Sequence, residues 1–222
     1  MHMNSMLVAA TATAASTTPS LNVPACPALA TVQYDNSVPD RAEFPLTQVD
    51  LCYDDALIHF TFTAYNETNF YFDESQGTND PIWMYEVMEA FIHRGTNDPQ
   101  HYLEIEVNPN NVTYQAFIYN PSKVRAADAP LDRFYVANPL ADGMLAETTL
   151  NREAETWVSK MVVPLGLFNV DNGKGKGTEW RMNFFRTVTS PEMFPDQELG
   201  AWSVPDEPNF HMTPFFGHIC FV

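Results

Sequence analysis

The sequence predicts an all-β protein, an antiparallel β-sandwich of jelly-roll type, in which residues 23–222 form a single domain. Three observations predict this fold class. Short runs with period-two alternation, or with β-branched and aromatic residues, recur between turn residues. The chain contains 17 prolines, which suit short strands and turns better than helices. No helix cap is followed by a long apolar pattern with a period of 3.6 residues.

The first half of the chain contains four expected strands. Residues 57–65 are rich in β-branched and aromatic side chains, and residues 83–92 form a second apolar run. Residues 103–107 alternate apolar and acidic side chains, as a half-exposed strand does. Residues 108–111, Asn-Pro-Asn-Asn, have turn chemistry. Residues 112–119 are therefore expected to return as the antiparallel partner of the preceding strand.

The second half contains three further expected strands. Residues 156–163 form one, which ends at Pro164. Residues 165–168 are short and apolar, and we expect one helical turn there. Residues 180–187 and 218–222 are the last two strands. Trp157 and Trp180 lie inside these strands and are expected in the core.

The composition limits the classes of partner. Hydrophobic residues make up 45% of the chain, enough for a real core. Asp and Glu number 28 against 11 Lys and Arg, and the formal net charge is −17. Such a surface repels phosphate backbones and anionic lipids, so we expect no nucleic-acid and no membrane partner. A neutral small-molecule ligand or a bound cation suits this charge, although acidity also simply keeps a secreted protein soluble. The chain is expected to be a monomer or a homodimer.

Several features indicate a secreted protein. Residues 1–22 are rich in Ala, Thr and Ser and are expected to be a leader or a disordered segment, although they lack a basic start and a long apolar stretch. Asn66 and Asn111 begin N-x-Thr sequons and are candidate glycosylation sites. No apolar run reaches the roughly 18 residues of a membrane helix.

The chain has three cysteines, Cys26, Cys52 and Cys220, so at least one is unpaired or paired between chains. A disulfide between Cys26 and Cys52 would attach the N-terminal arm to the sheet. Pairings of either residue with Cys220 are the alternatives. Cys220 lies among apolar residues and is expected to be a buried thiol.

Five segments in order resemble the carbohydrate-binding module family 9-like (CBM9-like) fold, which overlaps with the DOMON-like sandwiches. The segments are LCYDDALI at 51–58, NDPIW at 79–83 with EVMEAFI at 86–92, YLEIEVNP at 102–109, WRMNFFR at 180–186, and GAWS at 200–203 followed by Phe210-His211 and Phe216-Gly217. Their order and approximate spacing hold from about residue 30 to residue 222. The resemblance implies a site on one sheet face, where two tryptophans hold a sugar ring.

The resemblance assigns Trp83 and Trp202 as this aromatic clamp, with Glu89 and Arg186 as polar anchors. Strand alternation over residues 83–91 would place Trp83, Tyr85 and Glu89 on one face. The alternatives without a role in ligand binding are an edge-strand charge for Glu89 and a structural ion pair for Arg186 with Glu89 or Glu106.

Phe184 is expected among the apolar ligand contacts. The resemblance also raises the possibility of structural calcium. Asp54, Asp55, Asp73 and Asp80 are possible oxygen ligands, but no loop has a diagnostic calcium spacing. Beyond this calcium, no metal site and no cofactor are expected.

Two functions from different classes follow. The first is a non-catalytic carbohydrate-binding module that clamps a neutral sugar. The second is a cofactor-independent pericyclase, because the chain also resembles a fungal secreted branch of this fold that includes hetero-Diels–Alderases of tropolone–sesquiterpenoid biosynthesis. Such modules usually accompany a catalytic domain, and we expect no second domain here, so the sequence narrowly favours the enzyme.

The enzyme would dehydrate a tropolone carbinol to a quinone methide and join it to a terpene polyene such as humulene, largely by orientation. Arg186 would stabilise charge on the tropolone oxygens, and Glu89 or His211 would move the proton. His211 is otherwise read as a satisfied buried histidine. A glycosidase needs two facing carboxylates, but Glu104 and Glu106 are expected to form a solvated stripe.

Overall fold

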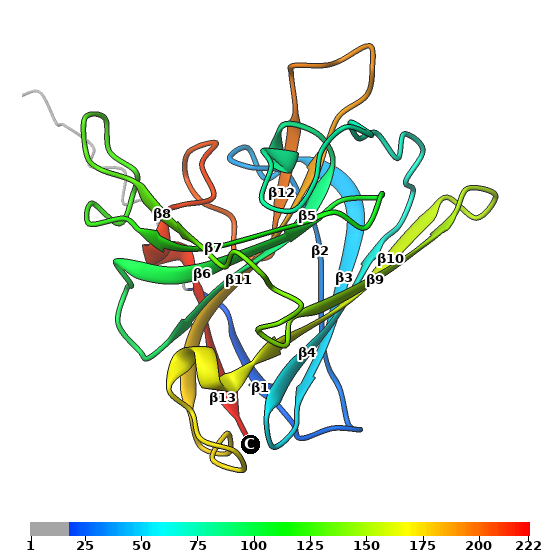
Figure 1. Ribbon diagram of the computed structural model, residues 1–222. Helices are drawn as coiled ribbons and strands as arrows, with labels where there is room; N and C mark the ends of the chain where they lie inside the picture. The colour runs from blue at the N-terminus through cyan, green and yellow to red at the C-terminus, as the bar shows by residue number, and fades with distance from the viewer. Residues whose placement is uncertain (1–17) are drawn as a thin grey trace, which may run out of the picture.

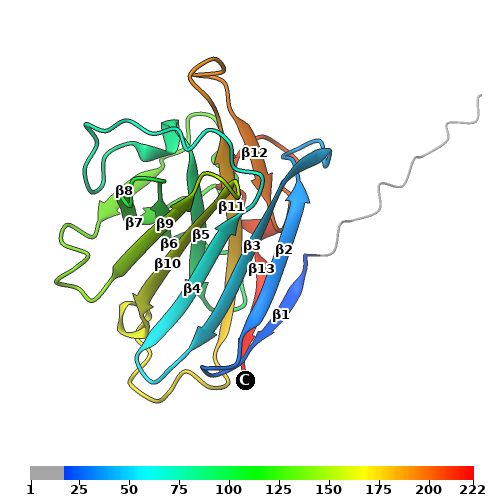
Figure 2. The ribbon, with the colours of Figure 1, turned by 90° about the vertical axis from the view of Figure 1, so that its right-hand side faces the viewer.

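A computed structural model describes residues 18–222 as two β-sheets packed face to face (Figure 1). The larger sheet contains, in spatial order, β1 (Ser20–Val23), β13 (Gly217–Phe221), β11 (Glu179–Val188), β5 (Val87–Arg94), β6 (His101–Val107), β7 (Thr113–Tyr119) and β8 (Asp132–Tyr135), and β12 (Glu198–Ala201) also pairs with β11. The smaller sheet contains β2 (Ala30–Asn36), β3 (Glu43–Tyr53), β4 (Leu57–Ala64), β10 (Thr156–Pro164) and β9 (Leu145–Asn151). Its five strands lie side by side toward the viewer in Figure 2. The prediction of an all-β sandwich is confirmed.

Strand pairing is antiparallel throughout the described chain except between β1 and β13, which pair in parallel. The expected strands at 57–65, 103–107, 112–119, 156–163, 180–187 and 218–222 correspond to β4, β6, β7, β10, β11 and β13. The helical turn expected at 165–168 is the 3-10 helix η2 (Leu165–Phe168). Another 3-10 helix, η3 (Thr213–Phe215), precedes β13.

Two boundaries differ from the expectation. The strand expected from residue 83 begins at Val87, because Pro81 leads into the 3-10 helix η1 (Ile82–Met84) instead. Pro81 has no N–H for a sheet ladder, so a turn is the natural outcome there. At the N-terminus, β1 begins at Ser20 and pairs with β13, so Ser20–Asn22, expected in the leader or disordered segment, form part of the sheet. Residues 1–17 of that segment lie outside the described residues.

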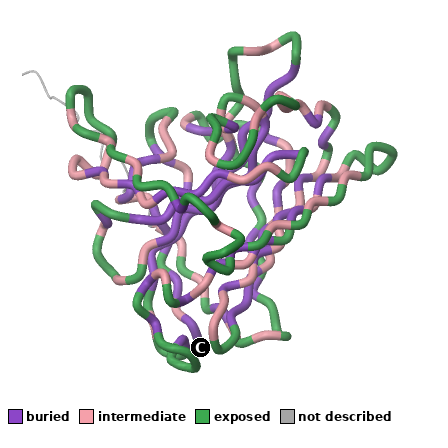
Figure 3. The backbone as a smooth tube through the Cα atoms, in the orientation of Figure 1, coloured by how far each residue is buried: buried purple, intermediate pink, exposed green. Residues whose placement is uncertain are grey.

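The main core lies between the sheets. In β4 the alternation buries Ile58, Phe60 and Phe62, and the rings of Phe60 and Phe62 meet Phe184 of β11 from the opposite sheet. Trp157 and Trp180 are buried in this core, as expected. Burial of one such aromatic side chain contributes about 1.5–3 kcal/mol. Figure 3 shows the buried positions concentrated along the strands.

A second apolar cluster covers the outer face of the larger sheet. Val87 and Phe91 of β5, Tyr102 of β6, Tyr114 of β7 and Phe185 of β11 belong to it. Loops with partly buried apolar residues pack over them, among them those containing η1 and residues 199–210. Strands β5 and β6 are therefore buried on both faces. The strand expected at 103–107 is present, but the prediction that it is half-exposed was wrong for this reason.

Cys26 and Cys52 form a disulfide with a Cα–Cα distance of 5.2 Å, which confirms the expected pairing. Cys220 is a free, half-buried thiol. Asn66 and Asn111 are exposed at positions with positive φ, and their glycosylation stays a prediction. Within residues 18–222, no helix has the length and apolar character needed to cross a membrane.

Candidate functional site

A cavity of about 170 Å³ opens on the outer face of the larger sheet, beneath the covering loops. Its floor contains Glu89 and Phe91 of β5, Glu104 of β6 and Thr187 of β11. Trp83 of η1 forms part of its wall. The cavity therefore joins strand residues from the sheet to loop residues that are distant in the sequence.

Trp83 is held in place by hydrogen bonds from neighbouring segments. Its carbonyl accepts a hydrogen bond of 2.7 Å from the Gln197 side chain. Asn79, just before η1, accepts hydrogen bonds from the backbone and side-chain amides of Gln115 on β7 and donates one to the Val136 carbonyl. The loop that presents Trp83 is thus attached to the sheet on one side and to the loop before β12 on the other.

Three glutamates meet at and beneath the floor of the cavity, which Glu89 and Glu104 line and Glu106 does not. Glu89 and Glu106 are cross-strand partners in β5 and β6, and Glu104 shares the face of Glu106 two residues away. One carboxylate oxygen of each lies within 4.8 Å of one from each of the others, and all three side chains are buried. Sequence reasoning placed Glu104 and Glu106 on a solvated stripe, and the covering loops overturn that expectation.

Burial sets the protonation behaviour of the three glutamates. Loss of hydration raises the pKa of Glu104 to about 7. Burial, with repulsion between the neighbouring carboxylates, raises the pKa of Glu89 and Glu106 well above the usual range. At neutral pH the cluster therefore holds protons. A protonated carboxyl can donate a hydrogen bond as well as accept one.

Arg125 and Arg133 line the cavity near these carboxyl groups. The Arg133 guanidinium lies 5.6 Å from the centroid of the Trp83 ring, a cation–π distance. Neither arginine forms an ion pair with any residue in the described part of the chain. Both guanidinium groups therefore keep hydrogen-bond donors available to a ligand.

His211 lines the cavity as a neutral side chain. Its Nδ1 lies 2.6 Å from the Tyr102 hydroxyl, and its ring stacks on Phe91 at 5.2 Å. Burial first, and the charges of Arg125 and Arg133 second, lower the pKa of His211 to about 3. A structural role for His211, as a buried histidine whose hydrogen bonds are satisfied, fits these contacts better than a role in proton transfer.

Arg186 lies on the opposite face of the sheet from this cavity. In β11 the neighbouring Phe185 is the cross-strand partner of Glu89, whereas Arg186 is opposite Met88 of the main core. Its guanidinium donates a hydrogen bond of 2.9 Å to Glu67. The assignment of Arg186 as an anchor or catalytic group of the site is corrected, because it forms a structural ion pair.

Trp202 and Phe184 also belong to the interior. Alternation sends Ala201 to the outer cluster and Trp202 to the other face, where its ring lies 5.6 Å from Phe184. Phe184 is fully buried in the main core. Trp83 and Trp202 are thus on opposite faces of the larger sheet, and the expected clamp between them is not formed.

Tyr85 is near the cavity in sequence but lies in another aromatic group. It stacks on Phe194 at 5.1 Å and meets Tyr71 edge-on at 5.2 Å. Of the residues expected in the site, the structure brings together Trp83, Glu89 and His211. It adds Glu104, Arg125, Arg133 and Phe210. Two sequence signals pointed to these additions, the acidic alternation at 103–107 for Glu104 and the Phe210-His211 pair for Phe210.

Two of the four aspartates considered for calcium accept hydrogen bonds from residues close to them in the sequence. Asp54 accepts hydrogen bonds from the backbone of Ala56 and Leu57, and Asp73 accepts them from Ser75. Among residues 18–222, the group of three ligating side chains close enough to share an ion is that of the buried glutamates.

Comparisons with solved structures agree with this fold. A putative carbohydrate-binding protein from Bacteroides uniformis superimposes with a TM-score of 0.66 at 17% identity, covering 93% of this chain and all of the other. A carbohydrate-binding module of family 9 from Caldicellulosiruptor kristjanssonii, in complex with cellotriose, has a TM-score of 0.57 at 13% identity, covering 91% of this chain and 93% of the other. A family 9 module from the same organism, in complex with glucose, has a TM-score of 0.54 at 13% identity, covering 91% of this chain and 95% of the other. The protein therefore has a CBM9-like β-sandwich fold.

No family model matches the chain. It belongs to the same protein family as the "Extracellular protein" of the fungus Arthroderma benhamiae, with 52% identity over 224 residues and full coverage of both chains. That relative and the Cys26–Cys52 disulfide are consistent with secretion.

Proposed function

We propose that this protein binds a neutral sugar unit in the outer-face cavity, without catalysing a reaction. The observation that carries the proposal is the composition of the cavity. It combines an aromatic wall at Trp83, carboxyl groups at Glu89 and Glu104, and unpaired guanidinium groups at Arg125 and Arg133. These are complementary to the apolar C–H face and the ring of hydroxyl groups of a sugar.

The proposed contacts have distinct roles. The Trp83 ring would contact the apolar face of the sugar. Glu104, whose pKa of about 7 leaves it partly protonated at neutral pH, can both donate to and accept from a hydroxyl group. Arg133 would donate to a second sugar oxygen. The structural neighbours that were solved with cellotriose and glucose support a ligand of this class.

The dimensions of the cavity weigh against the pericyclase hypothesis. Pockets that enclose drug-sized ligands measure about 300–1,000 Å³, and this cavity measures about 170 Å³. A hetero-Diels–Alder reaction requires a tropolone and a terpene in the same cavity. Of the proton-transfer and charge-stabilising groups assigned to that reaction, Arg186 faces the core and His211 has a pKa of about 3. We therefore favour sugar binding, the reverse of the order that sequence suggested.

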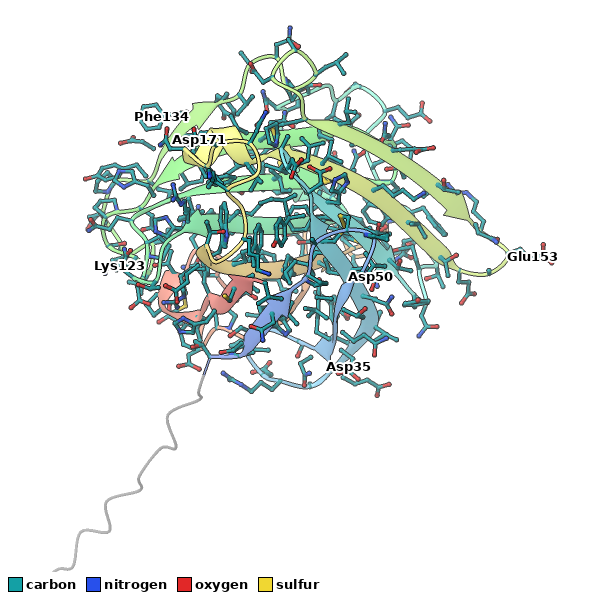
Figure 4. The ribbon with its side chains drawn as sticks, turned by 90° about the horizontal axis from the view of Figure 1, so that it is seen from below. Asp35, Asp50, Lys123, Phe134, Glu153 and Asp171 are labelled. Atoms are coloured by element: carbon teal, nitrogen blue, oxygen red, sulfur yellow. A yellow bond between two sulfur atoms is a disulfide. The ribbon has the colours of Figure 1, made fainter. Side chains whose placement is uncertain are left out.

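The test is a titration with soluble neutral mono- and oligosaccharides, followed by tryptophan fluorescence and by isothermal titration calorimetry. Trp83→Ala removes roughly 1.5–3 kcal/mol of apolar contact, so binding should weaken roughly 10- to 150-fold. The matched control is Phe134→Ala, which removes an aromatic ring that is 62% exposed and does not line the cavity. Phe134 lies at the periphery of the molecule in Figure 4.

Three outcomes are informative. Saturable binding that Phe134→Ala retains and Trp83→Ala loses would support the proposal. Equal binding by both variants would place the ligand elsewhere. No response to any neutral sugar would overturn the proposal. A product formed from a tropolone carbinol and humulene in higher yield or stereoselectivity than without protein would restore the pericyclase hypothesis.

A further inference from the structure

Glu106 has a polar group that a ligand in the cavity does not reach. Its side chain is fully buried, it does not line the cavity, and neither carboxylate oxygen has a hydrogen-bond partner among the described residues. Glu104, beside it, also has an unpartnered oxygen, Oε2. Buried carboxylates without partners are costly, and native proteins normally satisfy them with hydrogen bonds or an ion.

Tyr114 provides an independent observation at the same place. It is the cross-strand partner of Glu106 in β7, it is fully buried, and its hydroxyl also has no hydrogen-bond partner among the described residues. Its ring meets Trp83 edge-on at 5.0 Å, on the same face of the sheet as the glutamates. A buried, unpartnered oxygen from a third strand therefore lies on the same sheet face as the glutamates.

The positive charges near the cluster do not neutralise the glutamate carboxylates by direct ion pairing. Arg125 and Arg133 are the cationic side chains that act on these carboxyl groups. Both line the cavity above, and neither forms an ion pair with Glu89, Glu104 or Glu106. The Nδ1 atom of His211 is unavailable as a metal ligand, because it is hydrogen-bonded to the Tyr102 hydroxyl.

We propose that Glu89, Glu104 and Glu106 bind one divalent metal ion with a preference for oxygen ligands, of the Ca²⁺ type, beneath the cavity. Oxygens within 4.8 Å of one another can all contact one ion, because Ca²⁺–oxygen distances are about 2.3–2.6 Å. A set made of carboxylates, without cysteine or histidine, favours calcium, manganese or magnesium over zinc. The Tyr114 hydroxyl is a further unpartnered oxygen on the same sheet face. The inference goes beyond the proposed function, because the ion can be measured with no sugar present.

The test uses the full chain after treatment with a chelator, in the absence of sugar and at constant ionic strength. Calcium, magnesium and manganese chlorides are titrated by calorimetry, and the melting temperature is followed at each concentration. Terbium, a calcium substitute, is titrated separately, and its emission is excited through nearby aromatic rings. We expect one saturable site, and a melting temperature that rises with the logarithm of ion concentration above the dissociation constant.

Glu106→Gln is the decisive variant, because it keeps the shape of the side chain, removes its charge and leaves the cavity lining unchanged. We expect it to lose the saturable site and the ion-dependent rise in melting temperature. The matched control is Glu147→Gln, on the exposed face of β9, which should bind the ion as the unmodified protein does. Circular dichroism checks that each variant is folded. If Glu106→Gln does not fold, Tyr114→Phe serves as a second, milder variant.

Two results would overturn the inference. One is the absence of saturable binding of any of these ions up to millimolar concentration in the unmodified protein, in which case protons alone neutralise the cluster. The other is equal binding by a folded Glu106→Gln variant, which would place the ion on the acidic surface. A separate sugar titration with and without chelator keeps the two proposals distinct. With the ion bound, Glu104 is deprotonated and can only accept from a sugar hydroxyl, so sugar binding measured with chelator tests the proposed function alone.

Discussion

Breaking the buried ion pair between Arg186 and Glu67 should destabilise the protein strongly. The guanidinium donates to Glu67 at 2.9 Å and to the Tyr65 carbonyl at 3.1 Å, and the two side chains are each 1% exposed. Arg186→Met would leave the Glu67 carboxylate buried without its cation, next to Glu86. Removal of one partner of a buried pair costs about 3–5 kcal/mol, out of a typical total stability of about 5–15 kcal/mol.

The expected change in melting temperature follows from the size of the domain. For 150–250 residues, 1 kcal/mol corresponds to about 2–4 °C, so 3–5 kcal/mol gives a decrease of roughly 6–20 °C. Calorimetry and denaturant unfolding measure it. The matched control is Arg41→Met, which breaks the exposed pair with Asp206, whose side chains are 42% and 65% exposed, and should cost no more than about 1 kcal/mol.

A loss below about 1 kcal/mol for Arg186→Met, similar to that for Arg41→Met, would refute the reasoning that burial gives this pair its strength. The same variant tests the corrected assignment of Arg186. Because the guanidinium faces the core, the folded variant should bind any cavity ligand with unchanged affinity. A change in affinity without a change in stability would return Arg186 to the functional site.

Three further predictions concern stability. Burial and a neighbouring glutamate raise the pKa of Glu86 from its usual 4.5 to about 8, so the folded state holds this proton more tightly than the unfolded state. Stability should therefore fall as the pH rises from about 4.5 to about 8, and Glu86→Gln should make that fall less steep in thermal melts. Replacing Cys26 and Cys52 together with Ser opens a loop with a sequence separation of 26 and should cost about 3.5 kcal/mol by denaturant unfolding; an unchanged midpoint would contradict this. Gly217→Ala should lower the melting temperature, because the added Cβ meets a tryptophan ring, whereas Gly166→Ala, with no atom within 4 Å, should be nearly neutral.

The local sequence was sufficient to predict the strands and the sandwich. The alternating and apolar runs at residues 57–65 and 156–163 have one periodicity and one buried face, and they became β4 and β10 with small boundary differences. The run at 83–92 failed at its start, because Pro81 begins a 3-10 turn that the apolar pattern does not reveal. The Cys26–Cys52 pairing was anticipated, but its alternatives were excluded only by the positions of the three cysteines in the fold.

The site residues were harder to assign because a residue's face depends on register. Arg186 and Trp202 have the residue types of a sugar site, but one step along a strand turns a side chain to the opposite face. The register between β11 and β5 places Phe185, not Arg186, opposite Glu89. The glutamates at 104 and 106 looked solvated for a related reason, since nothing local shows that loops cover the outer face.

The sequence by itself determined that this chain is an acidic β-sandwich, because side-chain periodicity, proline content and charge are properties of the chain read locally. Only the tertiary structure decided which face of the larger sheet carries the cavity and which side chains share it. That decision depends on strand register and on loops that join Trp83, Arg133 and His211 across long sequence separations. The same register brings Glu89 and Glu106 side by side, and burial then converts three ordinary glutamates into a cluster with strongly raised pKa values.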